Sequence, residues 1–134
     1  MTHLKKMKVV ILAGGFGSRL DEVTKSIPKP LVKIGKEPII LHIMKIYLKY
    51  DIRNFYIATG YKGEELAKFF LKKKKINKKI KNKLKFGLSI NFSINNKKCK
   101  VTLLNTGLNT MTGGRVKRIS KIISDETFLL TYGD

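Results

Sequence analysis

The sequence has little of several residues and patterns that would mark other classes of protein. Cys99 is the only cysteine, so the chain can form neither an internal disulfide nor a cysteine metal cluster, and a reducing compartment is expected. No apolar run approaches the roughly eighteen residues that a membrane-spanning helix needs. The apolar run Val9–Ala13 is also too short for the core of a signal peptide. These absences favour a cytoplasmic protein without a membrane segment.

Acidic residues are scarce as well. The chain has 9 Asp and Glu against 29 Lys and Arg, which gives a formal net charge of +20, and such an excess is typical of nucleic-acid-binding proteins. Residues 72–85 hold much of this charge, but they contain no acid and no aromatic ring on which a base could stack. Because lysine, asparagine and isoleucine are abundant throughout, we interpret the tract as a solvated segment that follows from composition. A lysine-rich nucleic-acid-binding module remains the alternative.

The spacing of apolar residues predicts strands and helices that alternate along the chain. Strands are expected over residues 8–13, 55–59, 88–94, 101–104 and 128–134, and helices over residues 39–48 and 64–71 and from Thr112 onward. The last strand is expected to be buried and to deliver a carboxylate. This order predicts an α/β fold with a Rossmann-like, doubly wound, mostly parallel sheet. Residues 8–13 would be its central strand, and a ligand would bind at the carboxyl ends of the strands.

Three glycines within four positions follow the first predicted strand, where residues 14–20 are Gly-Gly-Phe-Gly-Ser-Arg-Leu. Glycines let backbone N–H groups approach an anion closely, and Arg19 would add a forked positive group. Lys29 lies between Pro28 and Pro30, whose rings restrict the backbone around it, and would add a point charge. This combination predicts a nucleoside triphosphate site. In isolation, Lys29 would be interpreted as a solvated lysine in a proline turn.

Two common glycine-rich loops do not fit this segment. A dinucleotide-binding fingerprint that begins at Gly15 would require glycine at the position of Leu20. A P-loop ends in Gly-Lys followed by Ser or Thr, and no lysine occurs between Gly14 and Leu20. The dehydrogenase and P-loop interpretations are therefore set aside.

The segment 12–20, together with Pro-Lys-Pro at 28–30, resembles the signature of the sugar-phosphate nucleotidyltransferases at every fixed position. Within that family, the segments 105–118 and 131–134 look like those of the glucose-1-phosphate cytidylyltransferases. The resemblance runs from residue 8 to residue 134. It implies the formation of CDP-glucose and pyrophosphate from CTP and glucose 1-phosphate, with Mg²⁺ as cofactor, for nucleotide-sugar and surface-polysaccharide biosynthesis. A related transferase with another base or sugar remains the close alternative.

The resemblance also implies a role for individual residues. Arg19 and Lys29 would be catalytic, with Arg19 on the triphosphate and Lys29 against the phosphate under attack. Asp134 would hold Mg²⁺; the alternative is a strand residue without a role. The set expected to bind nucleotide and substrate is Leu12, Ala13, Gly14, Gly15, Phe16, Gly17, Ser18, Arg19, Lys29, Thr110, Arg115 and Asp134.

Members of the resembled family continue beyond the point that corresponds to Asp134. We therefore interpret residues 1–134 as the N-terminal, nucleotide-binding part of a single nucleotidyltransferase domain that is truncated at the C-terminus. The sugar pocket and a second metal-binding aspartate would lie in the other half. The expected partners are CTP and glucose 1-phosphate, with no specific nucleic acid and no membrane. The complete protein is expected to form a homo-oligomer, and the chain alone is expected to be inactive.

Overall fold

The sheet is built around strand β1, Lys8–Ala13. The computed structural model describes residues 7–13, 27–60, 63–73, 88–105 and 128–133. Val9, Val10 and Ile11 have no solvent-exposed surface, so this strand is buried on both of its faces, as its continuous apolar sequence predicts. It pairs in parallel with β4, Asn54–Thr59, on one side and with β7, Phe128–Tyr132, on the other. The prediction of a central parallel strand is confirmed.

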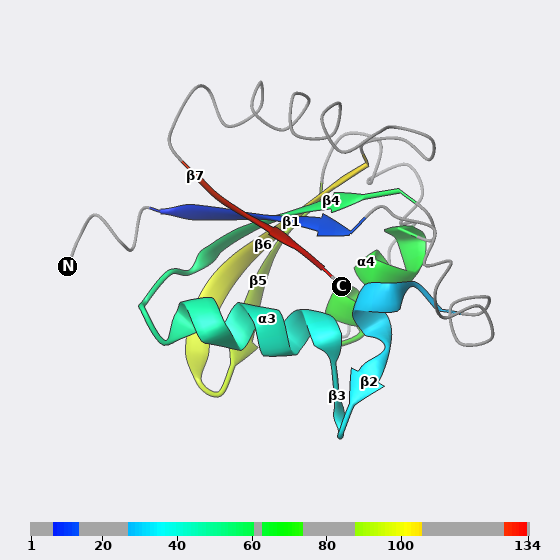
Figure 1. Cartoon of the computed structure of the whole chain (residues 1–134), viewed down its shortest axis with the longest axis horizontal. Helices are drawn as coiled ribbons and strands as arrows, with labels where there is room; N and C mark the ends of the chain where they lie inside the picture. Colours follow the sequence, from blue (N-terminus) through cyan, green and yellow to red (C-terminus); the bar gives the residue numbers. More distant parts are fainter. Residues whose placement is uncertain (1–6, 14–26, 61–62, 74–87, 106–127, 134) are drawn as a thin grey trace.

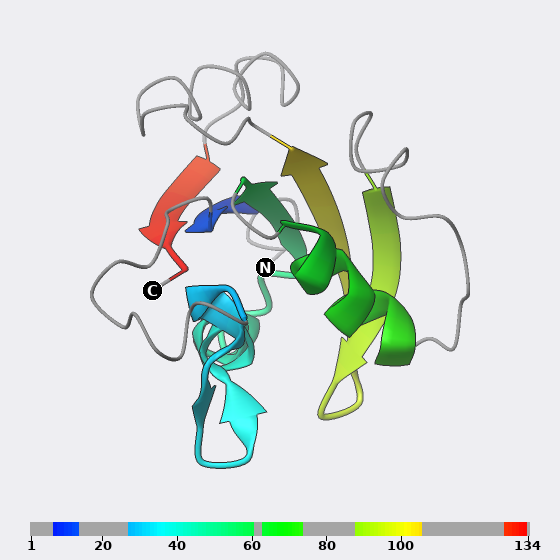
Figure 2. The ribbon, with the colours of Figure 1, turned by 90° about the vertical axis from the view of Figure 1, so that its right-hand side faces the viewer.

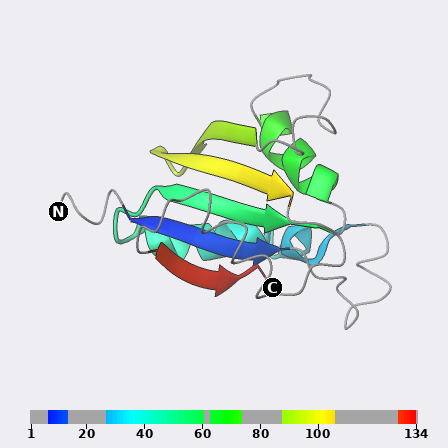
Figure 3. The ribbon, with the colours of Figure 1, turned by 90° about the horizontal axis from the view of Figure 1, so that it is seen from above.

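The five-stranded sheet has the order β5-β6-β4-β1-β7 (Figure 3). Strand β6, Lys97–Asn105, is parallel to β4, and β5, Leu88–Ile94, is antiparallel to β6. The chain thus adds β4 and β6 on one side of β1 and then returns to place β7 on the other side. The direction of sheet growth changes between β1 and β7. The expected α/β fold with a mainly parallel sheet is confirmed.

The two described helices cover one face of the sheet (Figure 2). Helix α3, Ile39–Leu48, begins directly after Pro38, and helix α4, Gly63–Lys73, follows β4. Phe70 of α4 packs edge-on against Phe92 of β5, with 5.1 Å between the ring centroids. Fully burying a side chain of this kind contributes about 1.5–3 kcal/mol. The helix predicted from Thr112 lies outside the described residues. Neither α3 nor α4 is long and apolar enough to cross a membrane.

The β5–β6 hairpin begins β6 four residues earlier than the sequence suggested. Asn95 and Asn96 form its two-residue turn with positive φ values of 49° and 65°, as a right-handed twist between the strands favours. Lys98 and Lys100 are exposed on either side of buried Cys99. The lysines made this stretch resemble a loop, but in a strand with one solvated face they alternate with core residues.

Strand β7 forms where residues 128–134 predicted a strand, but the prediction that it is buried is wrong. Leu130 is 45% exposed and Tyr132 is 59% exposed. Among the described strands, β7 pairs only with β1 and lies at the edge of the sheet. An apolar sequence cannot distinguish a central strand from an edge strand, because the strand is shielded from solvent by segments that are distant in the chain.

A short segment before α3 is tied firmly to that helix. It comprises the 3-10 turn η2, Lys29–Leu31, and the two-stranded ribbon of β2, Lys33–Ile34, and β3, Glu37–Pro38. The ring of His42 in α3 hydrogen-bonds through Nε2 to the carbonyl oxygen of Ile34 at 2.8 Å. Lys45 of α3 forms an ion pair with Glu37. These contacts fix the segment that carries Lys29 relative to the core.

The buried thiol of Cys99 is expected to react slowly with thiol reagents in the folded protein. Burial raises the pKa of Cys99 to about 11 from an ordinary value of 9.0, against a smaller lowering by Arg53. At pH 8, about one thiol in a thousand would then be the reactive thiolate, against about one in ten after unfolding. Absorbance assays with an aromatic disulfide, with and without denaturant, measure this difference.

The same pKa shift predicts a loss of stability in alkali. Below about pH 9 the thiol is protonated in both the folded and the unfolded chain, so stability does not depend on it. As the pH rises from about 9 to about 11, the unfolded thiol ionises first and the folded state loses stability relative to it. Cys99→Ala would remove the thiol's contribution to the loss. In the thiol-labelling experiment of the preceding paragraph, equal labelling rates for the folded and unfolded chains would contradict the burial of this thiol.

Candidate functional site at the carboxyl edge of the sheet

The four parallel strands end along one edge of the sheet. Ala13 at the end of β1 is in register with Thr59 at the end of β4, and Thr59 is in register with Asn105 at the end of β6. On the other side, Leu12 is in register with Tyr132 of β7. Open α/β sheets bind ligands outside the carboxyl ends of the strands, where the direction of sheet growth changes. In this fold that position lies between β1 and β7.

Gly133 brings the end of β7 unusually close to β1. Its backbone N–H donates to the carbonyl oxygen of Leu12 at 2.8 Å. A Cβ atom at this position would lie 3.2 Å from Cγ2 of Ile11 and 3.3 Å from both Cβ of Ala13 and the carbonyl oxygen of Leu12. The close approach therefore favours glycine. The hydrogen bond joins Leu12, two residues before the glycine-rich segment, to Gly133, the residue that precedes Asp134 in the chain.

Leu12 and Ala13 are the first two residues of the predicted binding set that the structure describes. Both are nearly covered, at 6% and 5% exposure, and their side chains pack into core clusters on opposite faces of the sheet. Their side chains therefore belong to the core, and what they can offer to a ligand is the backbone at the end of β1. Residues 14–18 and Arg19 lie outside the described residues.

Lys29 lies in a rigid turn beside this edge. Pro28 and Pro30 on either side of it are buried, and the Leu31 N–H donates to the Pro28 carbonyl oxygen at 2.9 Å. The Val32 N–H donates to the Lys29 carbonyl oxygen at 3.0 Å. In all three ribbon views, η2 lies next to the end of β7 (Figures 1–3). The prolines thus hold the backbone of Lys29 next to the carboxyl ends of β1 and β7.

Thr59 is a positioning residue at this edge that the sequence analysis did not select. It is 1% exposed, and its hydroxyl donates to the carbonyl oxygen of Leu104 at 3.1 Å, which links the ends of β4 and β6. A Cβ atom on Gly63 would lie only 2.7 Å from Cβ and Oγ1 of Thr59, so glycine lets the start of α4 pack directly on this side chain. The available signal was a threonine that closes an apolar strand immediately before Gly60.

The end of β4 is tied directly to the first residue of α4. The N–H of Gly63 donates to the carbonyl oxygen of Gly60 at 3.0 Å. Thr110, Arg115 and Asp134 lie outside the described residues. Within the described part of the chain, no three Asp, Glu, His or Cys residues come together to hold a metal ion. A metal at this edge would need ligands from elsewhere, including a bound phosphate.

Comparison with known proteins identifies a family and several relatives of this chain. Residues 8–127 match the family model described as nucleotidyl transferase. The chain is 45% identical over 129 residues to a probable glucose-1-phosphate cytidylyltransferase of Bacillus subtilis (strain 168) and 44% identical over 133 residues to a glucose-1-phosphate cytidylyltransferase of Salmonella typhimurium (strain LT2). Each match covers 96% of this chain and 50% of the relative. The chain thus spans about half the length of these curated relatives.

Two solved structures have a similar fold. One is HddC from Yersinia pseudotuberculosis complexed with GMP-PN, with a TM-score of 0.67 and 27% identity, and the match covers 96% of this chain and 48% of that one. The other is UDP-glucose pyrophosphorylase complexed with UDP-glucose, with a TM-score of 0.68 and 21% identity, over 95% of this chain and 45% of that one. With a family model that matches residues 8–127, the chain belongs to the nucleotidyl transferase family.

Proposed function

We propose that this chain is the nucleotide-binding part of an enzyme that makes CDP-glucose and pyrophosphate from CTP and glucose 1-phosphate. The observation that carries the proposal is the junction of β1 and β7 at the carboxyl edge, where the Gly133 N–H donates to the carbonyl oxygen of Leu12 at 2.8 Å, two residues before the glycine-rich segment. The names of the curated relatives support CTP and glucose 1-phosphate as substrates. The resemblance of residues 105–118 and 131–134 to the cytidylyltransferases supports the same choice.

The reaction needs no nucleophile from the protein. An oxygen of the sugar phosphate attacks the α-phosphorus of CTP, the new P–O bond forms, and the bond to the β-phosphate breaks as its electron pair leaves with pyrophosphate. The protein must therefore align two anions and stabilise the charge that develops on the leaving group. Residues 12–16 would line the nucleotide, and Gly17, Ser18 and Arg19 would wrap the triphosphate, with Arg19 as a forked donor to its oxygens.

Lys29 would lie against the phosphate under attack. Because two buried prolines hold its backbone, less conformational freedom is lost when its ammonium group contacts phosphate. Thr110 would contact the nucleotide. Arg115 would bind a phosphate oxygen near the start of its predicted helix, where the backbone dipole favours an anion.

Mg²⁺ would be held by Asp134 together with phosphate oxygens of the substrate. A single protein carboxylate fits this ion, because Mg²⁺ keeps several waters and is often bound through one or two carboxylates plus substrate phosphates. Gly133 supports this placement, since its hydrogen bond to Leu12 brings the chain to the end of β1 one residue before Asp134. When bound, the ion would neutralise charge on the phosphates.

The remaining parts of the proposal concern the complete protein. Residues 1–134 would form the first part of a single nucleotidyltransferase domain, and the sugar pocket and a second metal-binding aspartate would lie in the other half. We place the complete, homo-oligomeric enzyme in the cytoplasm, in the biosynthesis of nucleotide sugars for surface polysaccharides. The 134-residue chain would bind nucleotide without turning it over.

Calorimetric titration tests the nucleotide half of this proposal. In moderate salt with Mg²⁺, we expect CTP to bind the chain at least about tenfold more tightly than UTP, because a site that pairs with one exocyclic group leaves polar atoms unpaired with the other. Omitting Mg²⁺ should weaken CTP binding. Equal affinity for CTP and UTP would remove the base assignment, and no binding by a chain that circular dichroism shows to be folded would contradict the nucleotide site.

Lys29→Gln tests the role of the proline-held lysine. A charge-assisted contact with phosphate contributes about 1.5–3 kcal/mol, so we expect CTP affinity to fall at least about tenfold, equivalent to about 1.4 kcal/mol. Lys33→Gln is the matched control: it removes the same charge from exposed β2 only four residues away and should change affinity little. An equal effect of the two variants would indicate general electrostatic attraction and contradict a specific role for Lys29.

Gly133→Ala tests whether the close approach of β7 to β1 builds the site. The added Cβ must displace β7 or its neighbours by a few tenths of an ångström, at a cost to folding of about 1–3 kcal/mol, and we expect Mg²⁺-dependent CTP binding to be lost.

Gly35→Ala provides a control with a comparable loss of stability. Gly35 lies in the β2–β3 ribbon with φ +70°, and a Cβ atom added there would have no other atom within 4 Å. Alanine at this position therefore costs about 1–2 kcal/mol through backbone strain alone. It should leave CTP binding intact. Thermal unfolding of both variants checks that they lose a similar amount of stability. Retained CTP binding in Gly133→Ala would contradict the proposed geometry.

A further inference from the structure

A second positively charged feature lies at the opposite edge of the sheet. A surface depression of about 510 Å³ is lined by Arg53, Asn91, Phe92, Ser93, Lys98, Cys99 and Lys100. These residues lie just before β4, near the end of β5 and near the start of β6. The parallel strands rise about 3.3 Å per residue, so six residues of β4 place this depression about 20 Å from the carboxyl edge. It is therefore separate from the candidate nucleotide site at the carboxyl ends of β1 and β7.

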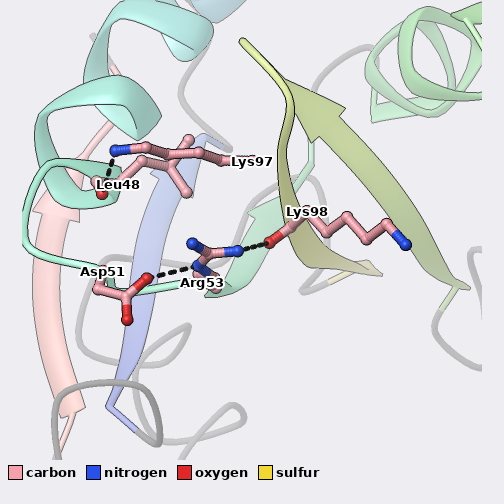
Figure 4. A network of polar contacts seen from close by, with 5 residues as sticks. All are labelled: Leu48, Asp51, Arg53, Lys97 and Lys98. Carbon is pink, nitrogen blue, oxygen red and sulfur yellow. Dashed lines mark hydrogen bonds and ion pairs between the residues drawn. The ribbon is translucent and has the colours of Figure 1, made fainter. Parts of the chain in front are cut away.

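Arg53 is held in place within this depression. Its Nε–H donates to Oδ1 of Asp51 at 2.6 Å, and its Nη1 donates to the carbonyl oxygen of Lys98 at 3.3 Å (Figure 4). The backbone N–H of Lys100 donates to the carbonyl oxygen of Arg53 at 2.8 Å. A guanidinium has five N–H donors, and the structure gives the other three no partner among the described residues. The side chain remains 38% exposed, so those donors are available to a ligand.

Lys98 and Lys100 supply the remaining charge. Both are exposed on one face of the β5–β6 hairpin, where the register pairs Ser93 with Lys98 and Asn91 with Lys100. Neither lysine has an acidic partner in the described part of the chain, and residues 88–105 contain no Asp or Glu. With Arg53 partly balanced by Asp51, the formal charge around the depression is about +2. Asn91 and Ser93 add neutral hydrogen-bond donors beside it.

We infer that this depression binds a small anion that carries a phosphate dianion. The planar guanidinium of a fixed arginine can donate to two oxygens of a tetrahedral phosphate, whereas flexible lysines can follow a ligand of varying length. Figure 4 shows the Lys98 side chain extending away from Arg53, so a ligand with two linked phosphates can reach further across the site than a single phosphate. Phe92 is 3% exposed, so it offers no ring on which a base could stack, and this favours a small phosphate over a nucleic acid. The inference does not depend on the proposed enzymatic function.

Amide chemical shifts of the ¹⁵N-labelled chain test this inference residue by residue. The titration uses inorganic pyrophosphate without Mg²⁺ in about 0.15 M salt, because salt at this concentration screens weak surface attraction. We expect saturable shifts at Asn91, Ser93, Lys98 and Lys100. Inorganic phosphate should bind at the same residues more weakly. Shifts at Leu12, Ala13 and Thr59, at the carboxyl ends of β1 and β4, report the nucleotide site separately, so failure of this site and failure of the nucleotide site are distinguishable.

A pair of double variants provides the control. Lys98→Gln with Lys100→Gln should weaken pyrophosphate binding at the depression by at least about tenfold. Lys33→Gln with Lys36→Gln removes two exposed lysines from the β2–β3 ribbon and should leave it unchanged. The inference fails if residues 91–100 do not shift, if both double variants weaken binding equally, or if a short DNA duplex binds there more tightly than pyrophosphate with affinity that grows with its length.

Discussion

Pairing of β1 along both of its edges is the constraint on which the rest of the structure depends. A strand without exposed surface at Val9, Val10 and Ile11 has no access to water, so its backbone groups must bond to neighbouring strands. Strands β4 and β7 supply those partners. Because both neighbours are parallel to β1, their carboxyl ends meet at one edge. The strand that organises the core therefore also determines where a ligand can bind.

The candidate site combines rigid parts from separate regions of the chain. Thr59 links β4 to β6 through the carbonyl oxygen of Leu104, and Gly133 brings β7 against Leu12. The β2–β3 ribbon is tied to α3 by His42 and Lys45, which fixes the turn that carries Lys29. None of these contacts requires a ligand. Such preorganisation suits a phosphoryl transfer, because the protein contributes mainly alignment and charge.

The two edges of the sheet differ in how they present positive charge. At the carboxyl edge, Lys29 is held between two buried prolines, and Gly133 joins the end of β7 to β1. At the other edge, Arg53 is fixed by Asp51 and by the Lys98 carbonyl oxygen, and the hairpin adds exposed lysines without acidic partners. Lys97 contributes to structure there, since its ammonium group donates to the Leu48 carbonyl oxygen at the end of α3 at 3.3 Å (Figure 4). The positively charged residues at the two ends of the strands are therefore held by different kinds of contact.

The sequence by itself determined the elements and the family. Apolar runs and helical spacing identified β1, α3, α4 and β5 because these patterns reflect local geometry, and the motif at residues 12–20 identified the nucleotidyl transferase family. Only the tertiary structure decided that β7 lies at an edge among the described strands, that the carboxyl ends of β1 and β7 meet, and that Thr59 and Gly133 hold strand ends together. Cover and close approach depend on residues far apart in the chain. Their spacing in the sequence carries no record of the distances between them.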